Sequence, residues 1–337
     1  MVSMLHITNG DSAADLIRQT GLSGDVLPWR DPMHHGPVPA DVGLDELSRL
    51  RIHYLSGGVE GGDTPGSHGF TERDATVARA SEYDEVILWF EHDLLDQLQI
   101  LQILDYFSSL DIGDLNLSII CIDEFEGFDG FRGLGQLSAQ QIKSLFPARQ
   151  KVTQVQLQQS ALCWKLFRQP DPAALQSLIG TDIPGLPFMR ASLLRHCQDF
   201  PWVNDGLTRT ERQLLNLVAD GETRVVQLFI RNMDLETCLY IGDARTFSIL
   251  ESLCNSEEPL LQTTDQKPFK HLYHTDVTQD EFRAQCLTLT DFGRRMLAGE
   301  IEVSGAIKRD EWLGGVHLQS LRSVWYWDEK NLVFKAG

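Results

Sequence analysis

The chain has 337 residues, of which 42% are hydrophobic and 23% charged, as in an ordinary soluble globular protein. Its formal net charge of −19 argues against broad attraction to nucleic acid or to anionic membranes, because both need a positive surface. The N-terminus shows no basic-then-apolar leader, and no apolar run is long enough to cross a bilayer. We therefore expect a cytoplasmic protein with no membrane partner, long enough for two or three domains.

Short apolar runs predict four strands in the first half of the chain. They are expected at residues 5–8, 25–29, 86–90 and 115–122. Helical patterns separate the strands, and Ser138 with Gln141 forms a capping box for a further helix. Strands that alternate with helices predict right-handed crossovers, a parallel sheet and helices on both of its faces. We therefore predict a doubly wound α/β domain over residues 1–148.

The second half of the chain predicts three further parts. Residues 149–205 form a helical connector, and Thr153 with Gln156 caps one of its helices. Residues 206–300 are similar to a winged helix, because a helix opened by Thr208 and Glu211 precedes two more helices and the ending L-T-L-T-x-x-G. Residues 301–337 include three tryptophans, which is typical of a docked segment rather than of a disordered tail.

The charge of the predicted winged-helix-like unit bears on its partner. Residues 207–300 contain ten Lys and Arg and fifteen Asp and Glu, so the unit is acidic overall. A DNA-binding domain is usually basic on one face. The count favours a protein contact or a structural role for this unit. DNA binding through residues 206–300 stays open as the alternative, with a recognition helix near 224–234 that presents Arg224 and Arg231.

The most informative segment for function is V-I-L-W-F-E-H-D-L-L-D-Q at 86–97. Its apolar half predicts a buried parallel strand, and ionisable residues follow at once. The carboxyl ends of parallel strands lie at one edge of the sheet, where ligands collect. Three of the predicted strands end in polar loops, so we expect one pocket there. We predict catalytic roles for Asp11, His34, Glu91, His92 and Asp93 and substrate-binding roles for Asn9, Ser12, Arg30, Asp31, Asp96 and Gln97.

Several of these residues have a simpler structural explanation. Asp11 or Ser12 could cap a helix, and Asp93 could cap the next, with Asp96 and Gln97 in its first turn. Capping does not explain Glu91 and His92. The tripeptide Gly10-Asp11-Ser12 also occurs in serine esterases, although that chemistry needs a histidine base and an acid to orient it.

Metal binding is a further alternative for this edge. Carboxylates together with the imidazoles of His34 and His92 could bind a divalent metal, but no tight ligand spacing such as H-E-x-x-H is present. The six cysteines form no C-x-x-C pair, which disfavours a structural zinc or disulfide framework. Without a metal, His92 or His34 would act as a general base whose tautomer a neighbouring acid fixes.

The chain resembles a known family through six short motifs taken together. They are H-I-T-N-G-D-S-A at 6–13, W-R-D-x-x-H-x-G-P-V at 29–38, L-W-F-E-H-D-L-x-D-Q-L at 88–98, G-L-G-Q-L-S at 133–138, L-T-R-T-E-R-Q-L-L at 207–215 and W-L-G-G-V-H-L at 312–318. This combination is similar to bacterial proteins grouped as domain of unknown function 1835. In that pattern an acid often follows the histidine that matches His34, whereas this chain has His35. The resemblance implies no activity.

The function is therefore predicted from the residues themselves. Acids and imidazoles that meet at strand ends without a basic surface are typical of an enzyme site for a small ligand. We expect a hydrolase or transferase that acts on a small polar or phosphorylated substrate. The alternative is a ligand-sensing regulator, whose α/β domain binds a metabolite and whose winged-helix-like unit contacts DNA or a partner protein.

Overall fold

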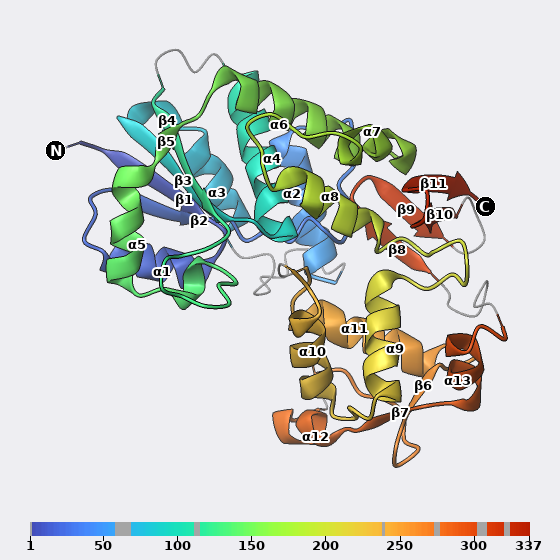
Figure 1. Ribbon diagram of the computed structural model, residues 1–337. Helices are drawn as coiled ribbons and strands as arrows, with labels where there is room; N and C mark the ends of the chain where they lie inside the picture. Colours follow the sequence, from blue (N-terminus) through green and yellow to red (C-terminus); the bar gives the residue numbers. More distant parts are fainter. Residues whose placement is uncertain are drawn as a thin grey trace. The chain divides into compact units, whose positions relative to one another are not determined.

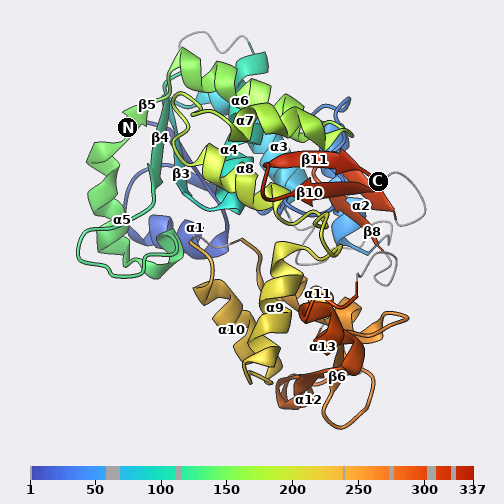
Figure 2. The ribbon, with the colours of Figure 1, turned by 45° about the vertical axis from the view of Figure 1, so that its right-hand side comes forward.

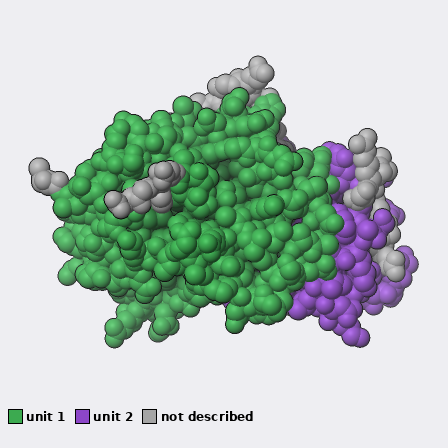
Figure 3. Space-filling model, turned by 90° about the horizontal axis from the view of Figure 1, so that it is seen from above, with its two compact units in different colours: residues 1–193, 312–317 green, residues 194–311, 318–337 purple. Residues whose placement is uncertain are grey.

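The computed structural model describes residues 2–57, 69–110, 115–237, 240–272, 277–301, 309–319 and 324–337. The chain divides into two compact units (Figure 3). Unit 1 comprises Met1–Leu193 and Trp312–His317, and unit 2 comprises Leu194–Glu311 and Leu318–Gly337. The finer four-part division stays a prediction. Within the described ranges, no helix combines the length and apolar character that a membrane span requires.

Unit 1 is built on a five-stranded sheet in the order β2-β1-β3-β4-β5 (Figure 1). Its strands are β1 (Met4–Thr8), β2 (Asp25–Pro28), β3 (Glu85–Glu91), β4 (Leu117–Ile122) and β5 (Gln150–Lys151). The first four run parallel, which confirms the predicted α/β class and its four strands. β5 pairs antiparallel with Ser118 and Ile119, so the sheet is mixed although mostly parallel. β5 consists of two exposed polar residues, which is too short a segment to show the alternating hydrophobic pattern of a strand. The sequence therefore predicted it as part of the helical connector.

The central strand β3 explains how the sheet is covered. All seven of its residues are buried, as expected for a strand with helices on both faces. The side chains of Ile87 and Trp89 point to one face, where α1 (Asp11–Gln19) and α5 (Ala139–Leu145) pack. Figures 1 and 2 both show α1 and α5 on one side of the sheet and α4 (Leu94–Ser109) on the other.

The remaining helices of unit 1 follow from capping and from apolar pattern. α4 is apolar on most of its circumference because it packs against both β3 and α6 (Gln154–Phe167). The predicted capping boxes Ser138–Gln141 and Thr153–Gln156 are confirmed at the starts of α5 and α6. The other helices of unit 1 are α2 (Leu44–Leu55), α3 (Phe70–Val77) and α7 (Gln176–Ile179), and α8 (Met189–Cys197) begins in unit 1 and ends in unit 2.

The tip of a late hairpin belongs to unit 1. The hairpin is formed by β8 (Asp310–Leu313) and β9 (Val316–Gln319). Its tip accepts a hydrogen bond from the backbone N–H of Val38 at Gly314 and donates one from Gly315 to the carbonyl oxygen of Phe167 (3.0 and 3.1 Å). A Cβ atom at Gly315 would lie 2.0 Å from the carbonyl oxygen of Arg168. Only glycine allows this approach, because the obstructing atom belongs to the backbone.

The hairpin tip gives a stability prediction. Gly315→Ala should lower the free energy of unfolding by about 1–3 kcal/mol, since the added methyl group forces the hairpin away from the end of α6. Gly43→Ala is the matched control, because a Cβ at Gly43 meets no atom within 4 Å. Denaturant titration of both variants measures the difference. Equal stabilities would show that the tip is not held where the structure places it.

Unit 2 consists of helices with small hairpins. Its elements are α9 (Arg209–Ala219), α10 (Val225–Asp234), α11 (Asp243–Asn255), β6 (Leu261–Thr263), α12 (Gln279–Ala284), β7 (Leu287–Leu289), α13 (Asp291–Leu297), β10 (Trp325–Asp328) and β11 (Val333–Ala336). The predicted capping box of Thr208 and Glu211 is confirmed at the start of α9. β6 pairs antiparallel with β7, and an isolated bridge joins Arg224 to Cys286 on the opposite side of β7.

Buried ion pairs and one tryptophan organise the interior of unit 2. The Arg195 guanidinium bonds Glu236 (2.8 Å) and lies over the ring of Tyr240. The Trp327 main chain bonds residues 201 and 203, which fastens the β10–β11 hairpin to the segment before α9. These contacts show that the end of the chain is an integral part of unit 2.

Candidate functional site

The site lies where the order of strands in the sheet reverses. β1 has β2 on one side and β3 on the other, so the chain leaves β1 and β3 in opposite directions. Open α/β sheets bind ligands in the crevice that such a reversal creates at the carboxyl ends of the strands. Asn9 directly follows β1, and Glu91 is the last residue of β3. The fold therefore brings these two residues to the position at which a ligand is expected.

Three buried carboxylates meet at this position, namely Glu91, Asp93 and Asp96, here called the acid cluster. An oxygen of each lies within 4.8 Å of an oxygen of the others, and their exposed fractions are 5%, 2% and 0%. The Asn9 amide joins two of them, since its Nδ2 donates to Oε1 of Glu91 (3.0 Å) and to Oδ1 of Asp96 (2.8 Å). The predicted residues Asn9, Glu91, Asp93 and Asp96 thus form one connected group.

Local folding rules place the members of the acid cluster. Asp93 is the N-cap of α4, and its Oδ1 accepts from the backbone N–H of Asp96 (2.9 Å), as its capping role predicts. Asp96 lies in the first turn of α4, where the helix dipole favours a negative charge. Its Oδ2 accepts from the backbone N–H of Glu91 (2.6 Å). The turn between β3 and α4 therefore folds around its own carboxylates.

The loop after β4 closes on the acid cluster through main-chain contacts. The backbone N–H of Leu134 donates to Oε2 of Glu91 (2.6 Å). A Cβ atom at Gly133 would lie 2.3 Å from Oε1 of Glu91, so a larger residue would displace the loop or the carboxylate. Next to it, a Cβ at Gly135 would lie 2.8 Å from Oγ of Ser12. Prediction from sequence missed Leu134 as a site residue, and the G-L-G pattern around it is the signal that could have indicated it.

Burial raises the pKa of every member of the acid cluster. The pKa of Glu91 rises to about 8, first through burial and then through the charge of Asp93, although hydrogen bonds from Leu134 and Asn9 oppose the rise. Burial also raises the pKa of Asp93 to about 7, against the backbone N–H groups that cap onto it. The pKa of Asp96 is raised well above its ordinary value by burial and by the charges of Glu91 and Asp93. At neutral pH the cluster therefore holds a proton unless a cation replaces it.

The acid cluster has two chemical capacities. A carboxyl whose pKa lies near 7 or 8 exchanges its proton at physiological pH, as general acid–base catalysis requires. Three converging carboxylates are also the oxygen ligands that hard divalent cations such as Mg²⁺ and Mn²⁺ prefer. Either a proton or a cation relieves the free-energy cost of burying three like charges.

Other predicted residues of the first two loops form ion pairs outside the acid cluster. Asp11 accepts three contacts from the Arg30 guanidinium at 2.5–3.1 Å, and its side chain is 62% exposed. Asp31 is fully buried and pairs with Arg51 (2.8 Å), which also donates to the carbonyl oxygens of residues 32 and 35. The Asp31 pair holds the loop after β2, whereas the Asp11 pair leaves its charges at the surface.

The two predicted histidines and the remaining polar residues are placed separately. His34 is buried and stacks on His35, with ring centroids 4.8 Å apart. His92 contacts the ring of Phe188 edge to face, and neither histidine is a member of the acid cluster. Gln97 joins the cluster through its amide, which donates to the main-chain oxygen of Glu91 (2.9 Å). Ser12 is exposed at the start of α1.

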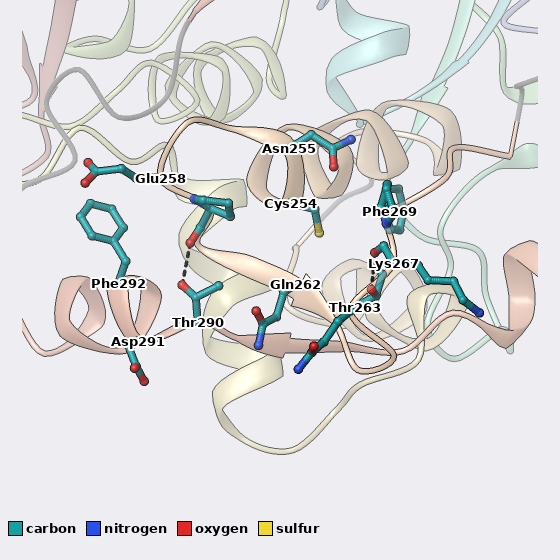
Figure 4. A pocket seen from close by; sticks show the side chains of 13 residues that line it. Cys254, Asn255, Glu258, Gln262, Thr263, Lys267, Phe269, Thr290, Asp291 and Phe292 are labelled. Carbon is teal, nitrogen blue, oxygen red and sulfur yellow. Dashed lines mark hydrogen bonds between the residues drawn. The ribbon is translucent and has the colours of Figure 1, made fainter.

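Unit 2 contains a pocket of about 790 Å³ between the end of α11, the strand β6 and the start of α13 (Figure 4). Its ionisable lining residues are spread along its length, with Glu258 and Asp291 toward one end and Lys267 at the other. Cys254 lies between them, and burial raises the pKa of its thiol to about 12, so the thiol is protonated at neutral pH. These groups do not converge on one point, so the acid cluster of unit 1 is the stronger candidate site.

Comparison with known proteins adds no constraint on this site. Neither the protein-family models nor the curated protein sequences include a match to the chain. The resemblance to domain of unknown function 1835 therefore stays a prediction that rests on the six motifs.

The raised pKa values predict how stability depends on pH. A carboxyl whose pKa is raised by folding is neutral in both states at low pH, and its contribution to stability is lost as pH rises through the folded pKa. For Glu91 the window runs from about 4.5 to about 8, and the loss is on the order of a few kcal/mol. Glu91→Gln should flatten this pH dependence, because glutamine does not ionise.

Denaturant titrations at pH 5, 6, 7 and 8 measure this slope, with the exposed substitution Glu46→Gln as control. The slope of the control should match that of the wild type. Identical slopes for the wild type and Glu91→Gln would mean that Glu91 is ionised throughout, which contradicts the raised pKa.

Addition of Mg²⁺ or Mn²⁺ shows whether a proton or a cation compensates the charge of the acid cluster. A bound cation should stabilise the wild type at pH 8 but not the Gln variant.

Proposed function

We propose that unit 1 is an enzyme, a hydrolase or transferase, that acts on a small polar or phosphorylated substrate at the carboxyl edge of the sheet. The observation that supports this function is the buried acid cluster at the reversal of strand order, with pKa values of about 7 and 8 for Asp93 and Glu91. Folding alone would be better served by uncharged residues there, because burying several acids is costly. Strongly shifted pKa values in a crevice are typical of catalytic sites.

In this proposal the acid cluster holds and releases a proton, and its neighbours position the substrate. Asn9 and the backbone N–H of Leu134 fix the Glu91 carboxyl. The exposed Ser12 and the half-buried Arg30 offer polar contacts to the substrate. The start of α1 has no side-chain cap, so the positive end of this helix is suited to an anionic group such as a phosphate.

The doubly wound class of unit 1 is part of the same proposal. The order 2-1-3-4-5 and the helices on both faces support it. If the compensating charge is a divalent cation, Glu91, Asp93 and Asp96 would hold it, and it would supply a Lewis acid for a phosphoryl or carbonyl oxygen.

Generic chromogenic substrates, p-nitrophenyl phosphate and p-nitrophenyl acetate, test the proposed reaction classes. Glu91→Gln and Asp96→Asn should lower kcat by at least about 100-fold, the usual contribution of a general acid or base. The wild-type pH profile should show an apparent pKa between about 7 and about 8. Asp15→Asn, on the exposed face of α1, is the control and should leave kcat unchanged. Turnover that survives Glu91→Gln with the same pH profile would remove the acid cluster from the mechanism.

Removal of metal decides which charge compensates the cluster. If EDTA abolishes turnover and Mn²⁺ restores it, the compensating charge is a cation. If EDTA has no effect and the pH profile remains, the compensating charge is a proton.

A second candidate is a ligand-sensing regulator, and the element order in unit 2 favours it. The elements of residues 206–300 are α9, the Arg224–Cys286 bridge, α10, α11, β6, α12 and β7, an order similar to that of a winged helix with α12 inserted between β6 and β7. In this order α11, rather than residues 224–234, takes the place of the recognition helix. α11 has two acids, Asp243 and Glu251, and its Arg245 pairs with Glu311. This charge favours a protein partner over DNA.

Fluorescence anisotropy with labelled duplex DNA tests the partner of this unit. We expect no saturable binding at about 0.1 M salt, because α11 offers no unpaired basic residue to neutralise phosphates. Saturable binding that weakens steeply with salt would favour the DNA-contacting regulator instead. If binding is observed, Arg245→Ala shows whether this residue contributes to it. A structural ion pair with Glu311 predicts a lower free energy of unfolding and an unchanged affinity for DNA.

A further inference from the structure

Unit 1 contains a cavity of about 320 Å³ at the open edge of β4. Its walls come from β4 and β5, from α4, α5 and the turn after α5, from the start of α6, and from the segment 185–188. The volume falls within the range of small-molecule sites in proteins. The cavity is separate from the acid cluster, but one residue connects it to the cluster and another connects it to His92. Gln97 lines the cavity and bonds Glu91, and Phe188 lines the cavity and contacts the ring of His92.

The chemistry of the walls selects an uncharged ligand. The described residues that line the cavity include no Asp, Glu, Lys, Arg or His. Burial raises the pKa of the Cys121 thiol, which therefore stays neutral. The polar side chains are the amides of Gln97, Gln150 and Gln156, and the others are mainly Ile, Leu and Phe. A charged group would lose its hydration here without a partner of opposite charge.

The edge of β4 adds main-chain hydrogen-bonding groups to one wall. The backbone N–H of Val152 donates to the carbonyl oxygen of Leu117 (2.8 Å), so the main-chain groups of Leu117 face β5. Main-chain direction alternates along a strand, so the N–H and C=O of Cys121 face the same edge. β5 pairs with Ser118 and Ile119, and beyond them the edge opens on the cavity.

We propose that this cavity binds the neutral, planar heterocycle of a nucleoside-type ligand. An amide-like edge of the ring, with one donor and one acceptor, would pair with the N–H and C=O of Cys121, and the ring faces would pack between Leu145 and Phe188. The free edge spans only residues 120–122, which is short for an added peptide strand but suits a single ring. Gln156 holds the rim in place, because its amide donates to the carbonyl oxygen of Gly185 (3.0 Å).

The position of the cavity gives the bound ring a role. Since Gln97 and Phe188 connect the cavity to the acid cluster and to His92, the ring would anchor a substrate whose reacting group lies at the strand ends. This role rests on the proposed enzyme function, whereas binding of the heterocycle does not. Together they narrow the substrate class to nucleosides or nucleotides.

Isothermal titration calorimetry of the full chain with adenosine, guanosine, cytidine and uridine tests the proposal, with ribose and inorganic phosphate as control ligands. We expect one or more nucleosides to bind with 1:1 stoichiometry and neither control ligand to bind as tightly. Ala148→Phe fills the cavity from its rim and should weaken binding at least about tenfold. Ala75→Phe is the matched control at an exposed alanine of α3 and should leave the Kd unchanged.

The outcomes separate the cavity from the acid cluster. Failure of all four nucleosides to bind the wild type would overturn the proposal, as would a Kd that Ala148→Phe leaves unchanged. Ala148→Val gives a graded weakening if the Phe variant does not fold. Glu91→Gln should retain nucleoside binding. Nucleoside binding in a protein without hydrolase or transferase turnover would support the cavity and contradict the proposed function, whereas turnover without nucleoside binding would do the reverse.

Discussion

The arrangement of unit 1 depends on the hydrogen bonds that Glu91 makes. This residue ends the central strand and bonds Asn9 after β1 and Leu134 after β4, while its main chain bonds Asp96 in α4. Three chain segments that are distant in sequence, the end of β1, the turn between β3 and α4 and the loop after β4, therefore meet at one residue. A carboxyl group suits this position because its two oxygens accept several hydrogen bonds at once, and these bonds strengthen when the group is ionised. Its cost is a buried negative charge beside two others.

This cost explains why the cluster is more than a set of helix caps. Asp93 and Asp96 satisfy the rules for the start of a helix, and each would be stabilising alone. Their closeness to Glu91 makes ionisation of the cluster unfavourable, since the charge of Asp93 raises the pKa of Glu91 and the charges of both raise the pKa of Asp96. Sites at which each local rule is satisfied but the sum is unfavourable are where function is expected. The compensating proton or cation is then part of the folded state.

The sequence predicted those parts of the fold that depend on local pattern. The four parallel strands follow from apolar runs, and three capping boxes follow from Ser or Thr paired with Glu or Gln three residues later. β5 was missed because two polar residues have no period, and their pairing depends on β4 rather than on their own sequence. Arg51 was missed for a related reason. It is fully buried, yet only its tertiary partner Asp31 makes that burial favourable.

The candidate site, like the fold, was predictable from the sequence only where it depends on local pattern. Asn9, Glu91, Asp93 and Asp96 could be identified because each follows a predicted strand, and parallel order brings strand ends together. The contacts of Asp11 with Arg30 and of Asp31 with Arg51 could not, because a loop sequence does not say which side its charges face. Leu134 contributes a backbone N–H, which every residue except proline has. Main-chain donors become visible only when the loop is placed.

In the proposed enzyme, the neutral cavity and the acid cluster would divide two tasks that conflict in a single pocket. Tight recognition needs apolar walls and satisfied amides, whereas proton transfer needs groups whose charge changes. Helix α4 serves both, since Asp96 belongs to the cluster and Gln97 and Ile100 line the cavity. Contacts to a non-reacting ring can hold the reacting group in register, and binding energy used in this way lowers the barrier rather than only the KM. A shift of α4 would therefore move both sites together.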